Sequence, residues 1–305
     1  MKQKLYWLAF AAALAIAPAF FYPVLLMKLM CFGLFAEAFN LMMGYVGLLS
    51  FGHAAFLGAA GYVTGYAMKH LGLSTELGLL VGTVAAAALG GLFGWLAIRR
   101  AGIYFAMITL ALAQMMYFVW LQAPFTGGED GLQDVPRGSL FGLIDLSDDR
   151  SLYWLVLAVF LGALGLIHRT INSPFGQILK AIRENEARAV SLGYDVARFK
   201  LLAFVLSAGL AGLAGATKVL VFRFATLTDA NWHLSGEVVL MTLLGGLGTF
   251  AGPLVGSSLI VLLQNELADK VGAWVGVIMG LAFIACVLLF RRGIVGELAA
   301  LMKKV

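Results

Sequence analysis

The sequence predicts an all-α polytopic membrane protein, and three observations lead to this fold class. Hydrophobic residues make up 62% of the 305 residues, charged residues only 12%, and the mean hydropathy is +0.94. Soluble domains are nearer half apolar and a quarter charged. Apolar stretches that approach the roughly 20 residues needed to cross a bilayer recur along the chain. The 37 glycines are typical of closely packed membrane helices. We expect residues 1–305 to form one domain of about ten transmembrane helices.

Ten apolar spans follow one another in the sequence. They lie near residues 5–27, 28–49, 52–68, 76–97, 103–121, 151–168, 200–222, 236–247, 252–266 and 272–290. The first span continues past Pro18 and Pro23, which favours an uncleaved helix over a secretory signal peptide. Four glycines and Pro253 interrupt the region 236–266, which is expected to cross twice. Eight or nine crossings, with one re-entrant segment, remain the alternative.

The distribution of Lys and Arg sets the expected orientation, because basic residues collect on the cytoplasmic side. The basic positions are Lys2, Lys4, Arg99, Arg100, the segment 169–200, Arg291, Arg292, Lys303 and Lys304. The loop 122–150 instead has six acidic residues and two arginines, so we expect it to be external. Ten crossings then place both termini in the cytoplasm.

One charge-dense segment contrasts with its apolar flanks. Residues 174–200 contain eight charged side chains and carry helix signals. Ser173 is a good N-cap with Pro174 at the first helical position, and Gly193 is suited to a left-handed end. Asp195 is placed to cap the next helix. We expect one helix whose apolar face is Phe175, Ile178, Leu179, Ile182 and Val190.

Glu186 interrupts this apolar face, and two interpretations of the segment compete. It is a solvated helix with i,i+4 ion pairs from Glu184 to Lys180 and Arg188, or an amphipathic helix that docks in a groove of a cytosolic partner. In the second interpretation Glu186 pairs with a cation of that partner, because a buried carboxylate without a partner is costly. The net charge of the segment is too small for a nucleic-acid footprint.

Five stretches, in this order, resemble signatures of the LivM-type permease subunits of branched-chain amino-acid ABC importers. They are LSFGHAAFLGAAGYV, GIYFAMITLALAQMM, TGGEDGL, ENEARAVSLGYDVARFKLLAFVLSAGLAGLAGA and GEVVLMTLLGGLGTFAGPLVG. The resemblance implies a bacterial plasma-membrane importer with a second permease subunit, two cytosolic ATPases and an external solute-binding protein. It also implies that residues 169–199 form a cytoplasmic coupling loop. The expected ATPase contacts are Glu186, Ala187 and Gly193, with Glu184 and Arg188 beside them.

The chain lacks a G-x-x-x-x-G-K-[ST] phosphate-binding motif. We therefore expect no enzymatic activity of its own, with ATP and Mg²⁺ used by the partner ATPases. His and carboxylate residues do not occur at metal-ligand spacing, so neither a metal nor a cofactor is expected in this chain.

Five residues within the spans are candidates for the solute pathway. Glu37 and Asn40 lie in the middle of a span, where an ionisable residue suggests function. His53 begins a helix within a family-like motif, and Thr109 and Gln114 offer a hydroxyl and an amide. For each of them, packing between helices is the competing interpretation.

Two external features bear on recognition of partner and solute. Thr126, Gly127 and Gly128, in the flexible acidic loop, are candidate contacts with the solute-binding protein, or simply a surface turn. Lys218 and Arg223 depart from the family, which is usually uncharged at these positions. They either extend to the headgroups or face the pathway, where they would favour an acidic solute.

The expected function is uptake of branched-chain or related small amino acids, with urea, amides or other small carboxylates as alternatives within the family. The alternative from another class is a self-sufficient secondary transporter. Such carriers usually show intramembrane ionisable relays and paired broken helices. This chain offers Glu37, Glu237 at a span edge, and little else.

Overall fold

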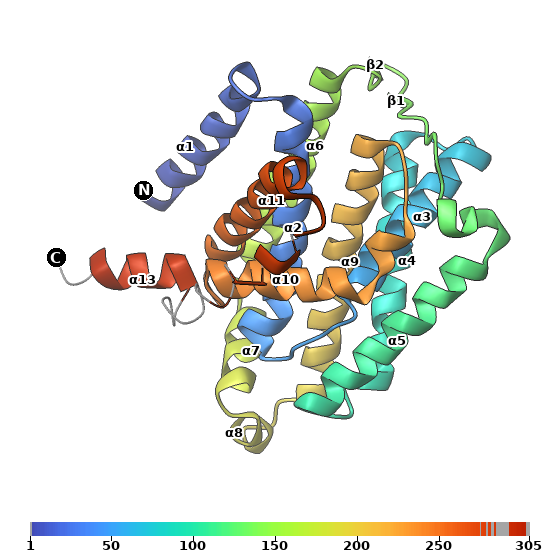
Figure 1. Cartoon of the computed structure of the whole chain (residues 1–305). Helices are drawn as coiled ribbons and strands as arrows, with labels where there is room; N and C mark the ends of the chain where they lie inside the picture. The colour runs from blue at the N-terminus through green and yellow to red at the C-terminus, as the bar shows by residue number, and fades with distance from the viewer. Residues whose placement is uncertain (1, 275, 279, 282–283, 285–292, 303–305) are drawn as a thin grey trace.

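The computed structural model describes residues 2–274, 276–278, 280–281, 284 and 293–302, and these are mostly helical (Figure 1). The larger helices are α1 (Lys2–Ile16), α2 (Pro23–Asn40), α3 (His53–His70), α4 (Thr75–Ala97), α5 (Ile103–Gln122), α6 (Asp149–Asn172), α7 (Pro174–Glu184), α9 (Val196–Phe222), α10 (Trp232–Gly245), α11 (Gly252–Val271) and α13 (Gly293–Met302). The short elements are α8 (Glu186–Ser191), the 3₁₀ turns η1 (Ala17–Ala19), η3 (Pro124–Thr126), η4 (Gly128–Asp130), η5 (Leu227–Ala230) and η6 (Gly272–Trp274), the π turn η2 (Leu41–Val46), and strands β1 (Ser139–Leu140) and β2 (Ile144–Asp145). The expected all-α fold class is confirmed.

Five helices in the described part of the chain are long and apolar enough to cross a membrane. They are α2 with its π turn (Pro23–Val46), α4, α5, α6 and α9. This number is below the expected ten. Most of the expected span 272–290 lies outside the described residues.

The expected boundary between the first two spans is wrong. Helix α1 ends at Ile16, a 3₁₀ turn follows, and α2 begins at Pro23 rather than at residue 28. Tyr22 is extended (φ −63°, ψ 122°), because the ring of a following proline disfavours the helical conformation. The two prolines therefore end one helix and start the next, instead of lying inside one span.

The region 236–266 forms two helices, as expected, but the first of them is short. Helix α10 has 14 residues, which corresponds to roughly 21 Å. A bilayer core is about 30 Å thick, so α10 alone does not cross it. In Figure 1, α10 runs crosswise to the direction of α9 rather than parallel to it. These features agree with the alternative in which one segment is re-entrant.

Helix α9 forms the centre of the bundle and packs against α2, α3 and α4. Small residues allow the close approach. A Cβ atom added at Gly212 would lie 2.2 Å from the Cβ of Ala86 on α4, so no larger residue fits there without a backbone shift. This is the small-residue packing that membrane helices use where burial of apolar surface gives little driving force.

The two ends of the bundle differ in charge as the sequence predicts. At one end α7 and α8 lie beside the starts of α5 and α9 (Figure 1), and Arg99 lines the same small hollow as Arg198. At the other end the loop 122–150 forms a small antiparallel hairpin of β1 and β2. Leu132 in this loop exchanges two backbone hydrogen bonds with Ala225, just beyond α9.

Candidate functional site

The charged segment consists of two helices and not of the single helix that its sequence predicts. Asn185 separates α7 from α8 with an extended backbone (φ −158°, ψ 98°). The Asn185 side chain then accepts a hydrogen bond from the amide of Arg188 at 3.0 Å. An asparagine with this capping geometry starts a new helix, and this local competition ends α7.

The predicted apolar face is split by the break. Leu179 and Ile182 on α7 are buried against the rest of the chain, whereas Val190 on α8 is 57% exposed. The expected alignment of Val190 with Ile182 is therefore wrong, because their spacing no longer runs along one helix. Segment α7 is attached to the bundle, and α8 projects from it (Figure 1).

Glu186 has a partner within its own chain. Its carboxylate lies 2.7 Å from the ammonium of Lys200, whose side chain is 5% exposed, while the Glu186 side chain is 49% exposed. This pair joins the start of α8 to the first turns of α9. The i,i+4 pairs expected for Glu184 with Lys180 and Arg188 do not occur among the ion pairs of the described residues.

The signals at the ends of these helices are confirmed. Ser173 accepts a hydrogen bond from the amide of Gly176 at 3.3 Å, and Asp195 accepts one from Arg198 at 3.2 Å. Gly193 has φ +87°, and the amides of Gly193 and Tyr194 donate to the carbonyls of Val190 and Ala189. This is the Schellman arrangement, which requires a residue that tolerates positive φ.

Several side chains of the charged segment (residues 174–200) remain exposed. Ala187, Arg188 and Glu184 are exposed, as are Leu192 (67%) and Tyr194 (40%). Glu184 is the last residue of α7, and the other four lie on α8 and the turn after it. Among the expected coupling residues, only Glu186 contacts another part of the chain through an ion pair in the described structure.

Two of the candidate pathway residues, His53 and Thr109, lie where the chain re-enters the bundle before α3. The side chain of His53 is fully buried, and its Nε2 is 2.8 Å from Oγ of Ser207. Because the Ser207 hydroxyl donates to the carbonyl of Ala38 at 2.5 Å, His53 Nε2 carries the hydrogen of the first bond. Ser207 lies eleven residues into α9, about 16 Å along its axis, so α3 begins deep inside the bundle.

The start of α3 has its backbone donors occupied. The Thr109 hydroxyl accepts from the amide of Phe51 at 3.1 Å, and the Ser50 hydroxyl accepts from Gly52. Ser235 on α10 accepts from the amide of Ala54 at 3.0 Å. Irregular backbone at membrane depth is tolerated only where such partners satisfy it. Thr109 and His53 thus hold this turn in place.

Asn40 and Glu37 have opposite surroundings although they lie one turn apart on α2. Both are fully buried. The Asn40 side chain accepts from the amide of Gly248 and donates to the carbonyl of Thr249, both at 3.0 Å. The Glu37 carboxyl oxygens have no hydrogen-bond partner among the residues described. Gln114 on α5 is similar, since its buried Oε1 is also without a partner within the described chain.

The TGGEDGL loop (residues 126–132) begins with a buried side chain and not with an exposed one. Thr126 is fully buried, and its hydroxyl hydrogen-bonds to the carbonyl oxygens of Trp120 at 2.6 Å and Ala123 at 2.7 Å. Thr126 therefore contributes no exposed surface to this loop in the described chain. Gly127 is exposed and Gly128 is half-buried, and both have positive φ. Exposed apolar residues in this loop include Phe125 in η3 and Phe141, Leu143 and Ile144 on the hairpin.

Arg137 attaches the loop 122–150 to two helices. Its guanidinium donates to the carbonyls of Leu220 and Val221 at the end of α9 and forms a 2.6 Å ion pair with Asp149 at the start of α6. Nearby, hydrogen bonds from the amide and hydroxyl of Ser147 lower the pKa of Asp145, which stays ionised at neutral pH.

Lys218 neither reaches the headgroups nor stands free in a pathway. It forms an ion pair with Asp229, and both side chains are about nine-tenths buried. The ammonium also lies near the rings of Phe32 and Phe222. Arg223 is exposed and ends α9 with φ +64°. Because its charge is already paired, Lys218 gives no reason to expect an acidic solute.

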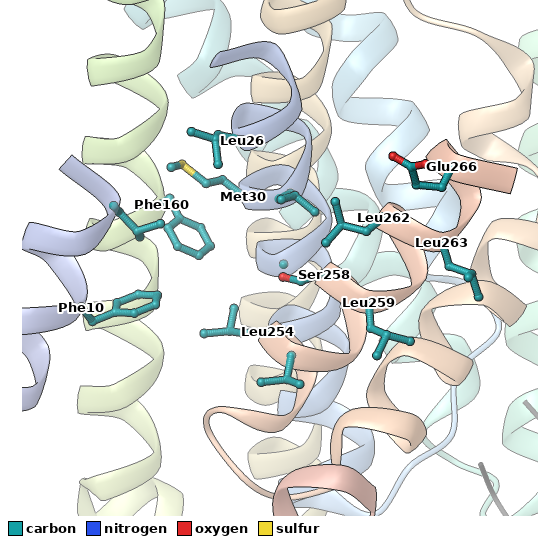
Figure 2. Close-up of a pocket in the computed structure, with 14 residues that line it drawn as sticks. Phe10, Leu26, Met30, Phe160, Leu254, Ser258, Leu259, Leu262, Leu263 and Glu266 are labelled. Carbon is teal, nitrogen blue, oxygen red and sulfur yellow. The ribbon is translucent and has the colours of Figure 1, made fainter. Parts of the chain in front are cut away.

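One hollow between the helices has an apolar lining. It measures about 780 Å³ and opens between α1, α2, α6 and α11. Figure 2 shows Phe10, Leu26, Phe160 and Leu259 lining it, with Glu266 at its edge. Such a lining suits hydrocarbon and not a zwitterion. No cluster of three or more His, Cys, Asp or Glu suited to a metal ion occurs in the searched part of the chain.

Three residues that organise these sites were not among the site residues expected from the sequence. They are Lys200, Arg183 and Arg137, and each bonds a group between 10 and 139 positions away. Helical periodicity relates residues three or four apart and is silent about such partners. Only the charge of Lys200 at the start of an apolar span hinted that it needed a counter-charge.

Comparisons with known proteins agree with the resemblance seen in the sequence. Residues 22–287 match the family described as branched-chain amino acid transport system / permease component. The chain is 28% identical to the high-affinity branched-chain amino acid transport system permease protein LivM of Escherichia coli over 253 residues, which is 75% of this chain and 60% of that protein. The corresponding LivH of E. coli is 25% identical over 250 residues, 75% of this chain and 79% of that protein.

A further relative has another transport role in its name. The autoinducer 2 import system permease protein LsrC of Klebsiella pneumoniae is 30% identical over 200 residues, 62% of this chain and 56% of that protein. The chain thus spans about three fifths of the length of the LivM relatives that it matches. No solved structure matches it. With the family pattern covering residues 22–287 of a helical membrane bundle, the chain belongs to the permease component family of branched-chain amino acid transport systems.

Proposed function

We propose that the chain is a permease subunit of an ATP-driven ABC importer for branched-chain or related small amino acids. The family membership and the names of the LivM and LivH relatives support this. The chain forms the translocation pathway together with a second permease subunit in a bacterial plasma membrane. Two cytosolic ATPases, which use ATP and Mg²⁺, drive it, and an external solute-binding protein delivers the solute. Its N- and C-termini are cytoplasmic.

One observation of the structure supports this function more than any other. Helix α8 projects from the end of the bundle at which Arg99, Arg100 and Arg198 are exposed, and it presents Ala187 and Val190 without cover from the described chain. A short helix with exposed apolar side chains and a charged surround suits a groove on another protein. The anchored α7 gives this helix a firm base, so a push on α8 acts on the bundle.

The solute class rests on the relatives alone. LivM and LivH are named for branched-chain amino acids, and LsrC for autoinducer 2. Urea, amides and other small carboxylates therefore remain alternatives within the same family. Binding of labelled leucine, urea and small carboxylates to the solute-binding protein encoded beside this chain would choose among them.

Co-purification and uptake test the proposed function together. The chain is expressed with its partner permease and ATPases, the complex is isolated, and ATP-driven uptake is measured in proteoliposomes with the solute-binding protein present. We expect Val190→Glu to reduce both ATPase recovery and uptake at least tenfold. Leu143→Glu is the matched control, since it places the same charge at an exposed apolar site on the opposite end. Equal recovery of ATPases with both variants would contradict the assignment of α8.

A self-sufficient secondary transporter is the alternative from another class. Glu37 is a buried carboxyl in the middle of a helix, and the chain re-enters the bundle before α3, features that such carriers share. Proteoliposomes that contain this chain alone, with an imposed proton or sodium gradient, distinguish the two functions. Solute uptake under these conditions would overturn the importer.

A further inference from the structure

Helix α7, the part of the coupling segment that is anchored to the bundle, makes a polar contact with the bundle in addition to the contacts of its buried apolar side chains. Arg183, at the end of α7, extends its guanidinium to η2, the π turn at the end of α2, where Nη1 donates to the carbonyl of Gly44. The aliphatic stem of Arg183 covers Gly47, since a Cβ atom at Gly47 would lie 3.0 Å from Arg183 Cγ. Although Arg183 is an exposed residue, its guanidinium and its aliphatic stem thus both contact the π turn and the glycine that follows it.

The other side of the π turn touches the turn between α10 and α11. A Cβ atom at Gly44 would lie 2.1 Å from Oδ1 of Asn40 and 2.8 Å from the amide nitrogen of Gly248. A Cβ atom added at Gly248 would in turn lie 2.9 Å from Arg183 Nη1. The backbones of the π turn and of the turn between α10 and α11 are therefore in direct contact. The guanidinium of Arg183 lies against both of them.

Asn40 completes the connection from inside the bundle. Its amide oxygen holds the amide of Gly248 and its amide nitrogen holds the carbonyl of Thr249. The Thr249 hydroxyl accepts from the amide of Gly252 at 3.1 Å and donates to the carbonyl of Gly246 at 2.7 Å. The turn between the short α10 and α11 is thereby tied to α2, the helix that carries Glu37.

Three segments far apart in sequence are joined by this polar bridge, which we define as Arg183, Gly44, Asn40, Gly248 and Thr249. The apolar contacts of α7, through Leu179 and Ile182, hold the coupling segment against the bundle but have no direction. Hydrogen bonds are directional, so the bridge transmits a displacement along a defined line. A π turn within a helix is also a common place for a functional adjustment.

We propose that Arg183 is the positioning residue through which movement of the coupling segment reaches the turn between α10 and α11. A partner that displaces α8 moves α7, and the guanidinium of Arg183 then draws the π turn and, through Asn40, the turn 246–249 with it. This proposal rests on the proposed function, because it assumes that an ATPase acts on α8. It assigns to Arg183 the coupling of ATP hydrolysis to transport and not the docking of the motor.

The experiment compares Arg183→Met with Arg169→Met in the complete importer complex in proteoliposomes. Arg183→Met keeps the stem that covers Gly47 and removes the hydrogen-bond donors. Arg169 is exposed at the end of α6, and its side chain makes no ion pair or hydrogen bond with the described residues, so it controls for the loss of one positive charge at that end. ATPase co-purification, ATP hydrolysis and uptake are measured for both.

We expect Arg183→Met to retain ATPase recovery and ATP hydrolysis within twofold of wild type while solute transported per ATP falls at least tenfold. Arg169→Met should leave all three quantities within twofold. Unchanged transport per ATP in Arg183→Met would overturn the proposal. Loss of ATPase recovery in that variant would also overturn it, because Arg183 would then belong to the docking surface.

Hydrogen exchange gives a readout that does not depend on transport. The amide of Gly248 is held by Asn40, so a peptide covering residues 244–250 should change its exchange rate when the wild-type complex binds ATP. We expect this nucleotide-dependent change to disappear in Arg183→Met and to persist in Arg169→Met. Its persistence in Arg183→Met would contradict the proposal. A wild-type chain that recruits no ATPases would instead overturn the proposed function, and the two failures are thus distinguishable.

Discussion

The carboxylate of Glu186 and the ammonium of Lys200 lie 2.7 Å apart and close the charged segment into a loop on the surface of the bundle. One partner is half exposed and the other is almost completely buried. Loss of the pair affects Lys200 more than Glu186, since a cation without a counter-charge is costly to bury. Glu186 thus supports the coupling segment from within, in addition to any contact that it makes with another protein.

A charge swap separates these two roles of Glu186. We expect Glu186→Ala to abolish ATP-driven uptake and to weaken co-purification of the ATPases, while the permease remains inserted in the membrane. The double variant Glu186→Lys with Lys200→Glu restores the pair in reverse order. If the pair within the chain is the main role, uptake should recover to within about fivefold of wild type. If uptake stays absent although the double variant inserts normally, Glu186 acts mainly through a partner.

Substitution by leucine is expected to have opposite effects on the free energy of unfolding at Glu37 and at Asn40. Glu37→Leu removes a buried carboxyl without a partner, so the free energy of unfolding should rise by about 1–3 kcal/mol. Asn40→Leu leaves the amide of Gly248 and the carbonyl of Thr249 unpaired, so stability should fall by about 2–5 kcal/mol. Unfolding of the two purified variants in detergent measures both effects. A lower stability of Glu37→Leu would show that the carboxyl is satisfied in the folded protein.

Uptake by the same Glu37→Leu variant tests its place in the pathway. A residue kept in spite of a cost in stability is expected to serve function. We therefore expect a more stable permease that assembles with its partners and transports at least tenfold less. Wild-type uptake by this variant would remove Glu37 from the candidate pathway residues.

Lys218 and Asp229 form a buried pair whose members should depend on each other. Lys218→Met leaves the Asp229 carboxylate uncompensated, and we expect a loss of about 3–5 kcal/mol in the free energy of unfolding. The double variant Lys218→Met with Asp229→Asn should regain most of this loss. Thermal unfolding of the single and double variants measures the coupling. Additive losses in the double variant would show that the pair contributes no mutual stabilisation.

Thiol labelling tests which end of the bundle is cytoplasmic. Asn185, between α7 and α8, and Gly142, on the hairpin at the opposite end of the bundle, are both exposed, so a cysteine at each site reports on one side of the membrane. In cells with an intact inner membrane, an impermeant thiol reagent added outside should label Gly142→Cys and not Asn185→Cys. The wild-type chain, which has the native cysteines Cys31 and Cys286, is treated in parallel, and its labelling gives the background to subtract. Labelling of Asn185→Cys from outside would reverse the orientation and remove the basis for ATPase docking.

The sequence by itself determined the fold class, most of the span positions and the capping of the charged segment. These features depend on neighbours in the chain: apolar runs of suitable length, a serine before a proline, a glycine at a left-handed end, an aspartate before a helix. Ser173, Gly193 and Asp195 occupy the predicted geometry because hydrogen bonds at helix ends join residues within a few positions of each other.

Tertiary structure alone decided which polar groups meet across the bundle. It paired Glu186 with Lys200 and Lys218 with Asp229, and it buried Thr126. It also brought Arg183 to Gly44 and Asn40 to Gly248 over more than a hundred positions. No period in the sequence encodes such contacts, because they follow from how helices cross and which small residues let backbones approach. The local elements were therefore predictable, and the connections between them were not.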